Sequence, residues 1–161
     1  MMIPPIALIS GAEGFIGSHL AGFLAKNGYQ VRALVRYNSF QSIGWLNLLS
    51  PQEKQAVEVV FGDIQDAAQM RSLMKDVAEV YHLAALISIP YSYQAAQSFI
   101  DVNISGTLNL LEAAKEAQIN RFLMVSTSEV YGTAQYVPID ENHPLHPQSP
   151  YSASKIGAES L

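Results

Sequence analysis

The stretch Gly11-Ala12-Glu13-Gly14-Phe15-Ile16-Gly17 decides the fold that this sequence predicts. It follows a short apolar run from Ile6 to Ser10 and opens a segment, Phe15 to Lys26, whose apolar residues recur with helical spacing. Glycines between a strand and a helix permit a tight turn, close approach of the backbone to a pyrophosphate, and close packing of the helix. The helix N-terminus then faces the anion. The sequence therefore predicts a strand, turn and helix that bind a dinucleotide.

Apolar runs of strand length alternate with stretches of helical period along the rest of the chain. The further strands expected are Gln30 to Val35, Val57 to Phe61, Glu79 to Leu83 and Arg121 to Ser126. The further helices expected are Trp45 to Leu49, Ala67 to Met74, Ser98 to Ala117, and one from Tyr151 until the sequence stops. Loops are expected at Tyr37 to Ser42 and at Thr133 to Ser149. This order predicts an α/β fold in one domain, a Rossmann-like doubly wound parallel sheet with helices on both faces.

The composition excludes several classes of function. The chain has 161 residues, 49% of them hydrophobic and 14% charged, so it can bury a sizeable core. A net charge of -5 argues against nucleic acid and against a membrane surface as partners. There is no apolar run long enough to span a membrane and no signal-peptide pattern, so a cytoplasmic protein is expected. With no cysteine and four histidines that lack ligand spacing, no metal site is expected.

Tyr151-Ser-Ala-Ser-Lys155 carries the strongest indication of chemistry. A separation of four residues places the phenol and the ammonium group on one helical face, about one turn apart. A phenol can act as a base near neutral pH only if a nearby positive charge favours the phenolate, and Lys155 would supply that charge. Thr127, Ser128 and Glu129 follow the fifth expected strand, at the sheet edge where doubly wound proteins bind ligands. Turn capping is the alternative role for Thr127 and Ser128.

Taken in order, these motifs resemble the extended short-chain dehydrogenase/reductase family over nearly the whole chain. The resemblance rests on Gly-x-x-Gly-x-x-Gly, Asp63, His82-Leu-Ala-Ala85, Asn103, Thr127 and Tyr151-x-x-x-Lys155. It implies that NAD or NADP is the cofactor, held by residues of the turn and of the strand ends: Gly11, Gly14, Phe15, Ile16, Gly17, Arg36, Asp63, Ile64, Leu83, Ala84, Ala85, Tyr151 and Lys155.

Two of these cofactor residues have specific expected roles. Asp63 would accept a hydrogen bond from the adenine amino group, with capping of the next helix as its alternative role. Arg36 stands where an NAD-selective site would offer a carboxylate, so it favours the 2'-phosphate of NADP, with a solvated loop residue as the alternative. For His82, a packed structural role is favoured over catalysis.

Ser126-Thr-Ser-Glu-Val-Tyr-Gly132 is similar to the active-site segment of nucleotide-sugar 4,6-dehydratases and UDP-glucuronate decarboxylases. Ser128 points toward the GDP-mannose-like enzymes. Two further segments, Arg36 to Phe40 with Gly44-Trp-Leu, and Ala84 to Tyr93, resemble the GDP-N-acetylglucosamine 4,6-dehydratases of bacterial legionaminic acid synthesis. This resemblance implies that Thr127, Glu129, Tyr151 and Lys155 are catalytic, and that Ser88, Ser128 and Asn103 lie toward the substrate.

The resemblance implies a nucleotide-sugar 4,6-dehydratase acting on a GDP-linked hexose such as GDP-N-acetylglucosamine. UDP-glucuronate decarboxylase and nucleotide-sugar epimerase remain alternatives, and so does a dinucleotide-binding module without turnover. Members of the family have roughly twice this length, with later strands and a smaller substrate domain, so the 161-residue segment alone is expected to be weak or inactive. A homodimer is expected, formed through the helix near Ser98 to Ala117 and the helix begun at Tyr151.

Overall fold

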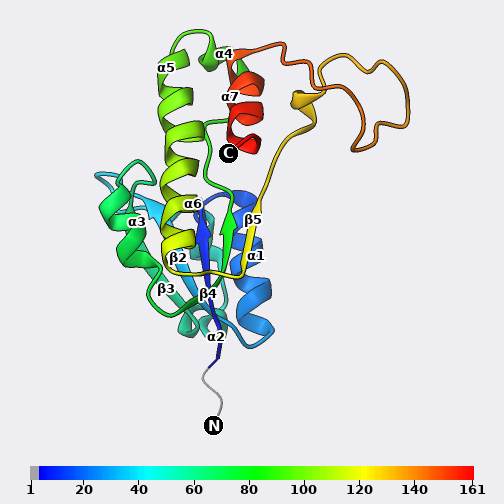
Figure 1. Ribbon diagram of the computed structural model, residues 1–161. Helices are drawn as coiled ribbons and strands as arrows, with labels where there is room; N and C mark the ends of the chain where they lie inside the picture. The colour runs from blue at the N-terminus through cyan, green and yellow to red at the C-terminus, as the bar shows by residue number, and fades with distance from the viewer. Residues whose placement is uncertain (1–3) are drawn as a thin grey trace. The chain divides into compact units, whose positions relative to one another are not determined.

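The computed structural model describes residues 4–161, which form a parallel five-stranded sheet with helices between the strands (Figure 1). The strands are β1 (Ile6–Ser10), β2 (Gln30–Arg36), β3 (Val57–Gly62), β4 (Val77–His82) and β5 (Arg121–Met124), in the order β3-β2-β1-β4-β5. The α-helices are α1 (Phe15–Lys26), α2 (Pro51–Gln55), α3 (Ala67–Leu73), α4 (Ile89–Ser92), α5 (Ala96–Phe99), α6 (Gly106–Glu116) and α7 (Pro150–Glu159). Two short 3-10 helices, η1 (Gly44–Leu48) and η3 (Ser128–Val130), and a π-helical stretch, η2 (Ile100–Ser105), complete the elements.

The chain divides into two compact units. The first comprises residues up to 84 together with 109–125, and the second comprises residues 85–108 and 126–161. The first unit holds the whole sheet, and the second is helical. Within the described residues the predicted fold class is confirmed, while the prediction of a single domain over the whole chain stays a prediction.

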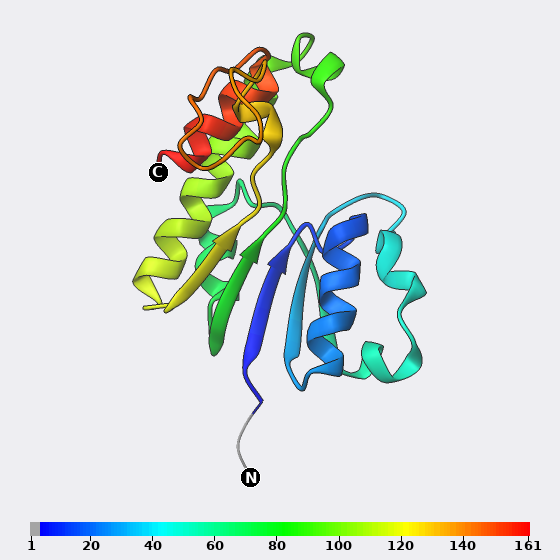
Figure 2. The same ribbon diagram turned by 90° about the vertical axis from the view of Figure 1, so that its right-hand side faces the viewer.

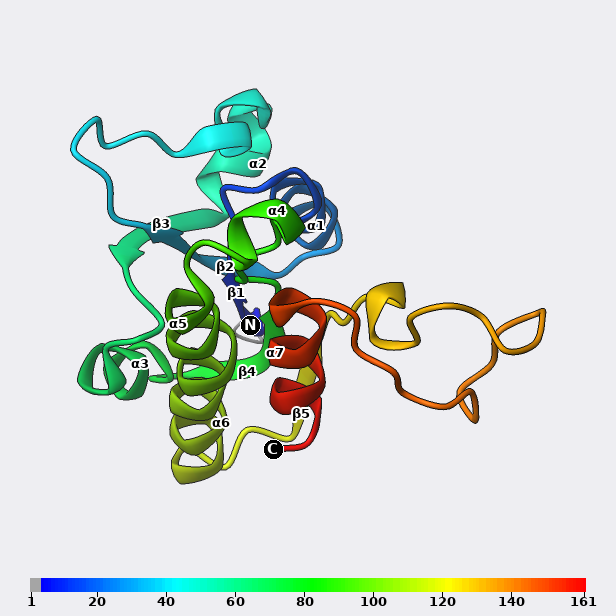
Figure 3. The same cartoon turned by 90° about the horizontal axis from the view of Figure 1, so that it is seen from above.

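In the first unit the sheet is covered on both faces. Figure 2 shows α1 on one face, and Figure 3 shows α3 and the body of α6 on the other. The central strand β1 is buried on both sides, because Ala7 and Ile9 pack into the cluster that includes Ala21 and Leu24 of α1, and Leu8 points to the opposite face. This burial fixes the position of the turn that follows β1.

The second unit is built around α7. Ser149 and Ser152 form a capping box at its start, Pro150 occupies its first turn, and the helix contacts α4, α5, η2 and η3. The long loop before α7 is ordered by the buried His143, whose Nε2 accepts a hydrogen bond from the Gln135 N–H at 3.0 Å. The capping box therefore fixes the start of α7, and the His143 contact orders the loop that precedes it.

The bounds of several elements differ from those predicted. The expected helix from Ser98 to Ala117 is helical over most of its length, but the π-helical stretch η2 interrupts it. The fourth strand starts two residues earlier, because Val77 pairs with Ile6 of β1, and the fifth strand stops at Met124. Three short elements, α2, α4 and η3, were not predicted, since a single turn of helix leaves little periodicity in the sequence.

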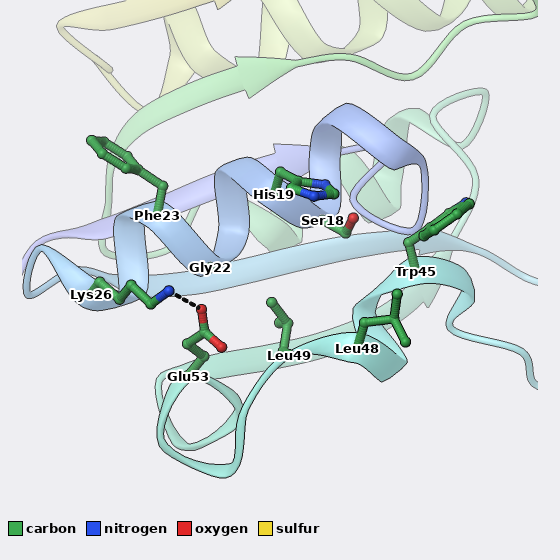
Figure 4. A pocket seen from close by; sticks show the side chains of 9 residues that line it. All are labelled: Ser18, His19, Gly22, Phe23, Lys26, Trp45, Leu48, Leu49 and Glu53. Carbon is green, nitrogen blue, oxygen red and sulfur yellow. Dashed lines mark ion pairs between the residues drawn. The ribbon is translucent and has the colours of Figure 1, made fainter.

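A membrane-spanning helix would have to be longer and more apolar than any helix found between residues 4 and 161. An open groove of about 360 Å³ lies along the outer face of α1 (Figure 4). The segment that contains η1 and α2 forms its other wall, and the residues predicted to bind cofactor or substrate are not among those that line it.

The Lys26–Glu53 ion pair spans this groove at 3.1 Å and has a consequence for pH (Figure 4). Ser50 caps α2, its backbone N–H donates to Glu53 Oε2 at 2.6 Å, and its hydroxyl oxygen accepts from the Glu53 N–H at 3.3 Å. These hydrogen bonds with Ser50, followed by the contact with Lys26, lower the pKa of Glu53 from 4.5 to about 2. The folded state thus binds the proton less well than the unfolded chain does.

We expect ionised Glu53 to stabilise the fold fully above pH 4.5, and this contribution to be lost as the pH falls toward about 2. Glu53→Gln should flatten the dependence of the unfolding free energy on pH in that window. Urea unfolding at a series of pH values measures this. Glu141→Gln, which removes an exposed carboxylate from the loop before α7, serves as the control, and equal pH slopes in the two variants would contradict the expectation.

Candidate functional site

The glycine turn after β1 is tightly packed on its inner side and open at Gly14. Gly11 has a φ of +70°, and a Cβ at this position would lie 2.8 Å from the backbone nitrogen of Ala84. A Cβ at Gly17 would clash with the carbonyl oxygen of Gly11 and lie 2.8 Å from Cα of Ala12. Gly14 is exposed at the N-cap of α1, and its Cβ would approach only Gly11 O, at 3.3 Å. Gly11 and Gly17 therefore serve the turn and the packing of the helix, and the approach of a dinucleotide over Gly14 stays a prediction.

The start of α1 suits an anion. The first hydrogen bond of the helix runs from Ser18 N–H to Gly14 O, so the amides of Phe15, Ile16 and Gly17 precede it. No acidic residue lies in the first turn, and the partial positive charge of the helix end is not neutralised there. The side chains of Phe15 and Ile16 are each 61% exposed, so their predicted contact with cofactor stays a prediction.

Ser10 joins the turn to the end of β4. Its hydroxyl oxygen accepts hydrogen bonds from the Leu83 and Ala84 N–H groups, both at 3.2 Å, and lies 2.7 Å from His82 Nδ1. Because the oxygen already accepts two hydrogen bonds, we assign its proton to His82 Nδ1. His82 is buried, which agrees with the structural role expected for it. Leu83 and Ala84 are thereby fixed beside Gly11, and Ala85 begins the second unit.

Asp63 lies at the end of β3 in a turn held from several sides. Its Oδ1 accepts from the Gln65 N–H at 3.0 Å, and its own N–H donates to Gln69 Oε1. Asn109 of α6 donates to the carbonyl oxygens of Ile64 and Gln65. Asp66 caps α3, so the alternative that Asp63 caps this helix is wrong. Contact of Asp63 and Ile64 with adenine stays a prediction.

Arg36 ends β2 with an exposed side chain, and its backbone N–H donates to Glu13 Oε1 at 3.0 Å. The sequence did not single out Glu13, which lies inside the glycine turn and reaches across to the neighbouring strand. The only indication of this contact in the sequence was an acidic residue between the first two glycines of the turn. This carboxylate is part of the candidate dinucleotide site.

In the second unit, Tyr151 and Lys155 are both buried on α7. The Tyr151 ring packs edge-on against Phe99, with 6.3 Å between centroids. Burial lowers the pKa of Lys155, and the charge of Glu159 partly offsets this effect. The two side chains predicted to be catalytic therefore belong to one helix that is rigidly capped and packed.

Thr127, Ser128 and Glu129 form the start of η3, which contacts α7. Thr127 Oγ1 accepts from the Glu129 N–H at 3.3 Å, which confirms the capping role and leaves the hydroxyl proton able to donate to a ligand. Ser128 and Glu129 are exposed. The structure thus brings the predicted acid-base residues onto two contacting elements of one unit.

Asn103 is buried in η2 with its amide engaged on both sides. Its Oδ1 accepts from the Leu86 N–H at 2.8 Å, and its Nδ2 donates to Leu86 O and to Ser154 Oγ, each at 2.9 Å. These bonds hold Leu86 to η2 and η2 to α7. Ser88 caps α4 through its hydroxyl oxygen. The substrate contacts expected of Asn103 and Ser88 stay predictions.

Among the His, Asp and Glu side chains of residues 4–161, no three lie close enough together to hold a metal ion.

A glycine turn in this sheet order, together with a Tyr-x-x-x-Lys helix, defines the extended short-chain dehydrogenase class of nucleotide-sugar dehydratases and epimerases. Residues 8–161 match the family model described as GDP-mannose 4,6 dehydratase, and the chain belongs to this family.

Relatives of known name and structure agree with this membership. The chain is 36% identical to the GDP-mannose 4,6 dehydratase of Homo sapiens over 95% of its length and 44% of that protein's. It is 34% identical to the structure of the dTDP-glucose 4,6-dehydratase DesIV from Streptomyces venezuelae with NAD and TYD bound, with a TM-score of 0.84, over 96% of this chain and 49% of that one. It is 30% identical to the UDP-N-acetylglucosamine 4-epimerase from Methanobrevibacter ruminantium, with a TM-score of 0.87, over 99% of this chain and 49% of that one. The chain thus spans about half the length of these relatives.

Substitutions at two of the three glycines, Gly17 and Gly14, should affect stability and dinucleotide binding separately. Gly17→Ala forces a methyl group against backbone atoms, so we expect a loss of about 2 kcal/mol or more in the free energy of unfolding. Gly14→Ala is sterically permitted but places a methyl group where a pyrophosphate would approach, so we expect a small change in stability and weaker dinucleotide binding. Thermal unfolding and calorimetric titration measure the two effects. Unchanged stability of Gly17→Ala, or unchanged binding by Gly14→Ala, would contradict these roles.

Proposed function

We propose that this chain carries the cofactor site and the acid-base residues of an NAD- or NADP-dependent nucleotide-sugar 4,6-dehydratase. The substrate class proposed is a GDP-linked hexose such as GDP-N-acetylglucosamine. The observation that carries the proposal is the contact between α7, with buried Tyr151 and Lys155, and η3, with Thr127 and the exposed Glu129. A base for an alcohol and a second base for a carbon acid are what this reaction requires.

The residues of the first unit fit a dinucleotide. The turn leaves Gly14 open beside an uncompensated helix start, and Glu13 Oε2 is a buried carboxylate oxygen without a hydrogen-bond partner among the described residues. Gly11, Gly14 and Gly17 would hold the pyrophosphate, and Asp63 would face the adenine. Arg36 is the side chain that would favour NADP at the end of β2. When bound, the nicotinamide accepts hydride from C4' of the sugar and later returns it to C6'.

In the first step Tyr151 removes the proton of the sugar 4'-hydroxyl while hydride leaves C4', and a 4-keto sugar is formed. The Thr127 hydroxyl orients the 4'-oxygen. Lys155 binds the nicotinamide ribose, and its positive charge favours the phenolate of Tyr151. Asn103 holds α7 against η2 and so positions both side chains.

The ketone acidifies the C5' proton, which Glu129 removes, and the C6' hydroxyl departs as water with the help of Ser128 or a bound water. Hydride then returns to C6' and a proton to C5', so the net change is loss of one water from the sugar. Glu129 lies on an exposed turn and needs no displacement of a protein partner to meet a substrate.

Epimerisation is the second candidate, because an epimerase is among the structures to which the chain is similar. An epimerase needs the oxidation at C4' but no base for C5'. UDP-glucuronate decarboxylation also begins with the 4-keto sugar and loses carbon dioxide in place of water. Glu129 favours the dehydratase, since its carboxylate has no role in simple epimerisation.

The full natural protein that includes these residues should convert GDP-N-acetylglucosamine or GDP-mannose to a product lighter by one water, as observed by mass spectrometry. UDP-glucuronate serves as the comparison substrate. Loss of carbon dioxide from it would favour the decarboxylase, and an unchanged mass with a new stereoisomer would favour the epimerase. Intact substrates in all three incubations would contradict the catalytic proposal.

Variants of two residues test the assigned steps. Tyr151→Phe should lower turnover by about 100-fold or more, since it removes the base for the alcohol. Glu129→Gln should block loss of water and exchange of the C5' proton with deuterated solvent, while oxidation at C4' still reduces the cofactor, as followed by absorbance. Tyr29→Phe and Glu141→Gln, which alter a tyrosine and an exposed glutamate outside the proposed site, are the matched controls. Proton exchange at the parent rate in Glu129→Gln would exclude Glu129 as the base.

Because the chain spans about half the length of its relatives, we propose that the 161-residue segment alone turns over slowly or not at all. We also propose a homodimer formed through the helices at Ile100–Ser105 and Gly106–Glu116 and through α7. The side chains of Ile100 and Leu108 are 45% and 42% exposed, which supports a covered apolar face. Leu108→Glu should shift the protein to a monomer in sedimentation velocity, and a monomeric parent protein would contradict the proposal.

A further inference from the structure

Glu13 lies in the glycine turn after β1, but its carboxylate reaches the end of the neighbouring strand β2. Its side chain leaves the glycine turn and accepts the Arg36 N–H at 3.0 Å through Oε1. The turn is joined to the same strand by the bond from Ala12 N–H to Leu34 O at 3.3 Å. The carboxylate therefore lies beside the backbone of Arg36, the residue at which dinucleotide-binding folds usually present an acidic side chain.

The segment after β2 folds back over Glu13 and fixes its position. Trp45 N–H donates to Glu13 O at 2.9 Å, and a Cβ at Gly44 would lie 3.1 Å from Glu13 Cβ. Asn38 closes this segment through hydrogen bonds with the backbone of Arg36 and Ser42. The Glu13 side chain is thus held by contacts on its backbone and on one carboxylate oxygen.

The other carboxylate oxygen, Oε2, is buried and has no hydrogen-bond partner among residues 4–161. A buried carboxylate oxygen without a donor is costly, since its lost hydration is not replaced. A ribose hydroxyl is a donor that can satisfy such an oxygen, and the adenosine ribose of a dinucleotide is bound at the end of the second strand. A 2'-phosphate has no proton to donate at neutral pH in its dianionic form and would bring negative charge against the carboxylate.

We propose that Glu13 is the residue that selects NAD over NADP, by accepting a hydrogen bond from the adenosine 2'-hydroxyl and repelling a 2'-phosphate. This inference rests on the proposed dinucleotide site. It reverses the preference that Arg36 alone would predict. The Arg36 side chain is exposed, so its attraction for a phosphate is screened by water and salt. The Glu13 carboxylate is partly buried and held in place, so its charge is screened less.

Direct binding measurements on the full natural protein test the proposal without turnover. Titration calorimetry should show NAD binding at least about tenfold more tightly than NADP, because a like charge facing the carboxylate is unfavourable. The analogue 2'-deoxy-NAD should bind the parent protein less tightly than NAD does. This second measurement needs no variant and so does not depend on how a substitution folds.

Variants then assign the effect to Glu13. Glu13→Gln keeps an acceptor for the Arg36 N–H and removes the charge, so the preference for NAD should fall by about tenfold. In Glu13→Ala, NAD and 2'-deoxy-NAD should bind alike. Arg36→Ala should leave NAD favoured, and Glu141→Gln, which removes an exposed charge from the loop before α7, should leave all affinities unchanged. Unfolding curves of each variant confirm that it is folded.

The outcomes separate the two proposals. Parent protein that binds NADP as tightly as NAD, or a preference for NAD that persists in Glu13→Gln, overturns the role of Glu13 and leaves the proposed function standing. An NADP preference that Arg36→Ala abolishes would assign the selection to Arg36. If neither dinucleotide binds, the proposed cofactor site itself is wrong, and the inference fails with it.

Discussion

The hydroxyl group of Ser10 is the contact on which the geometry of the candidate dinucleotide site depends. Its oxygen accepts hydrogen bonds from the N–H groups of Leu83 and Ala84, and the hydroxyl donates its own hydrogen bond to Nδ1 of buried His82. The Leu83 N–H also donates to the main-chain oxygen of Ser10 at 3.1 Å, so the hydroxyl and the carbonyl of one residue together join the ends of β1 and β4, where unpaired polar groups would be costly. Because this contact draws Ala84 against Gly11, no side chain fits at Gly11, and the tight turn follows from the packing.

The sequence predicted element bounds well where several local patterns indicate the same structure. β1 and α1 have the predicted bounds, because a buried apolar strand, a glycine turn and a helical stripe each indicate the same arrangement. The interruption of the expected helix at Ile100–Ser105 was not predictable from periodicity. A π-helical turn there brings the Asn103 amide to Leu86 and Ser154, and this tertiary contact outweighs the regular helical ladder.

The candidate catalytic residues were found because their chemistry restricts their spacing along the chain. Tyr151 and Lys155 must share a helix face, and Thr127 and Glu129 must follow a strand, so local sequence identifies them. The structure adds what holds them: the capping box of Ser149, the packing of Phe99 on Tyr151, and the contact of η3 with α7. These depend on residues distant in sequence, and no local pattern could indicate them.

Glu13 shows that a residue from another part of the sequence can bring a charge to the end of β2. The rule looks for an acidic residue at the end of β2 and finds Arg36, because it assumes that the side chain at that position supplies the acceptor. In the folded chain, the glycine turn brings the Glu13 carboxylate to the backbone of the same residue. The electrostatic interaction of a ligand with a charge depends on the distance between them and on how strongly water screens the charge. It does not depend on which strand or turn carries that charge. On the role proposed for Glu13, its partly buried carboxylate outweighs the exposed Arg36 guanidinium, because water and salt screen the exposed charge more strongly.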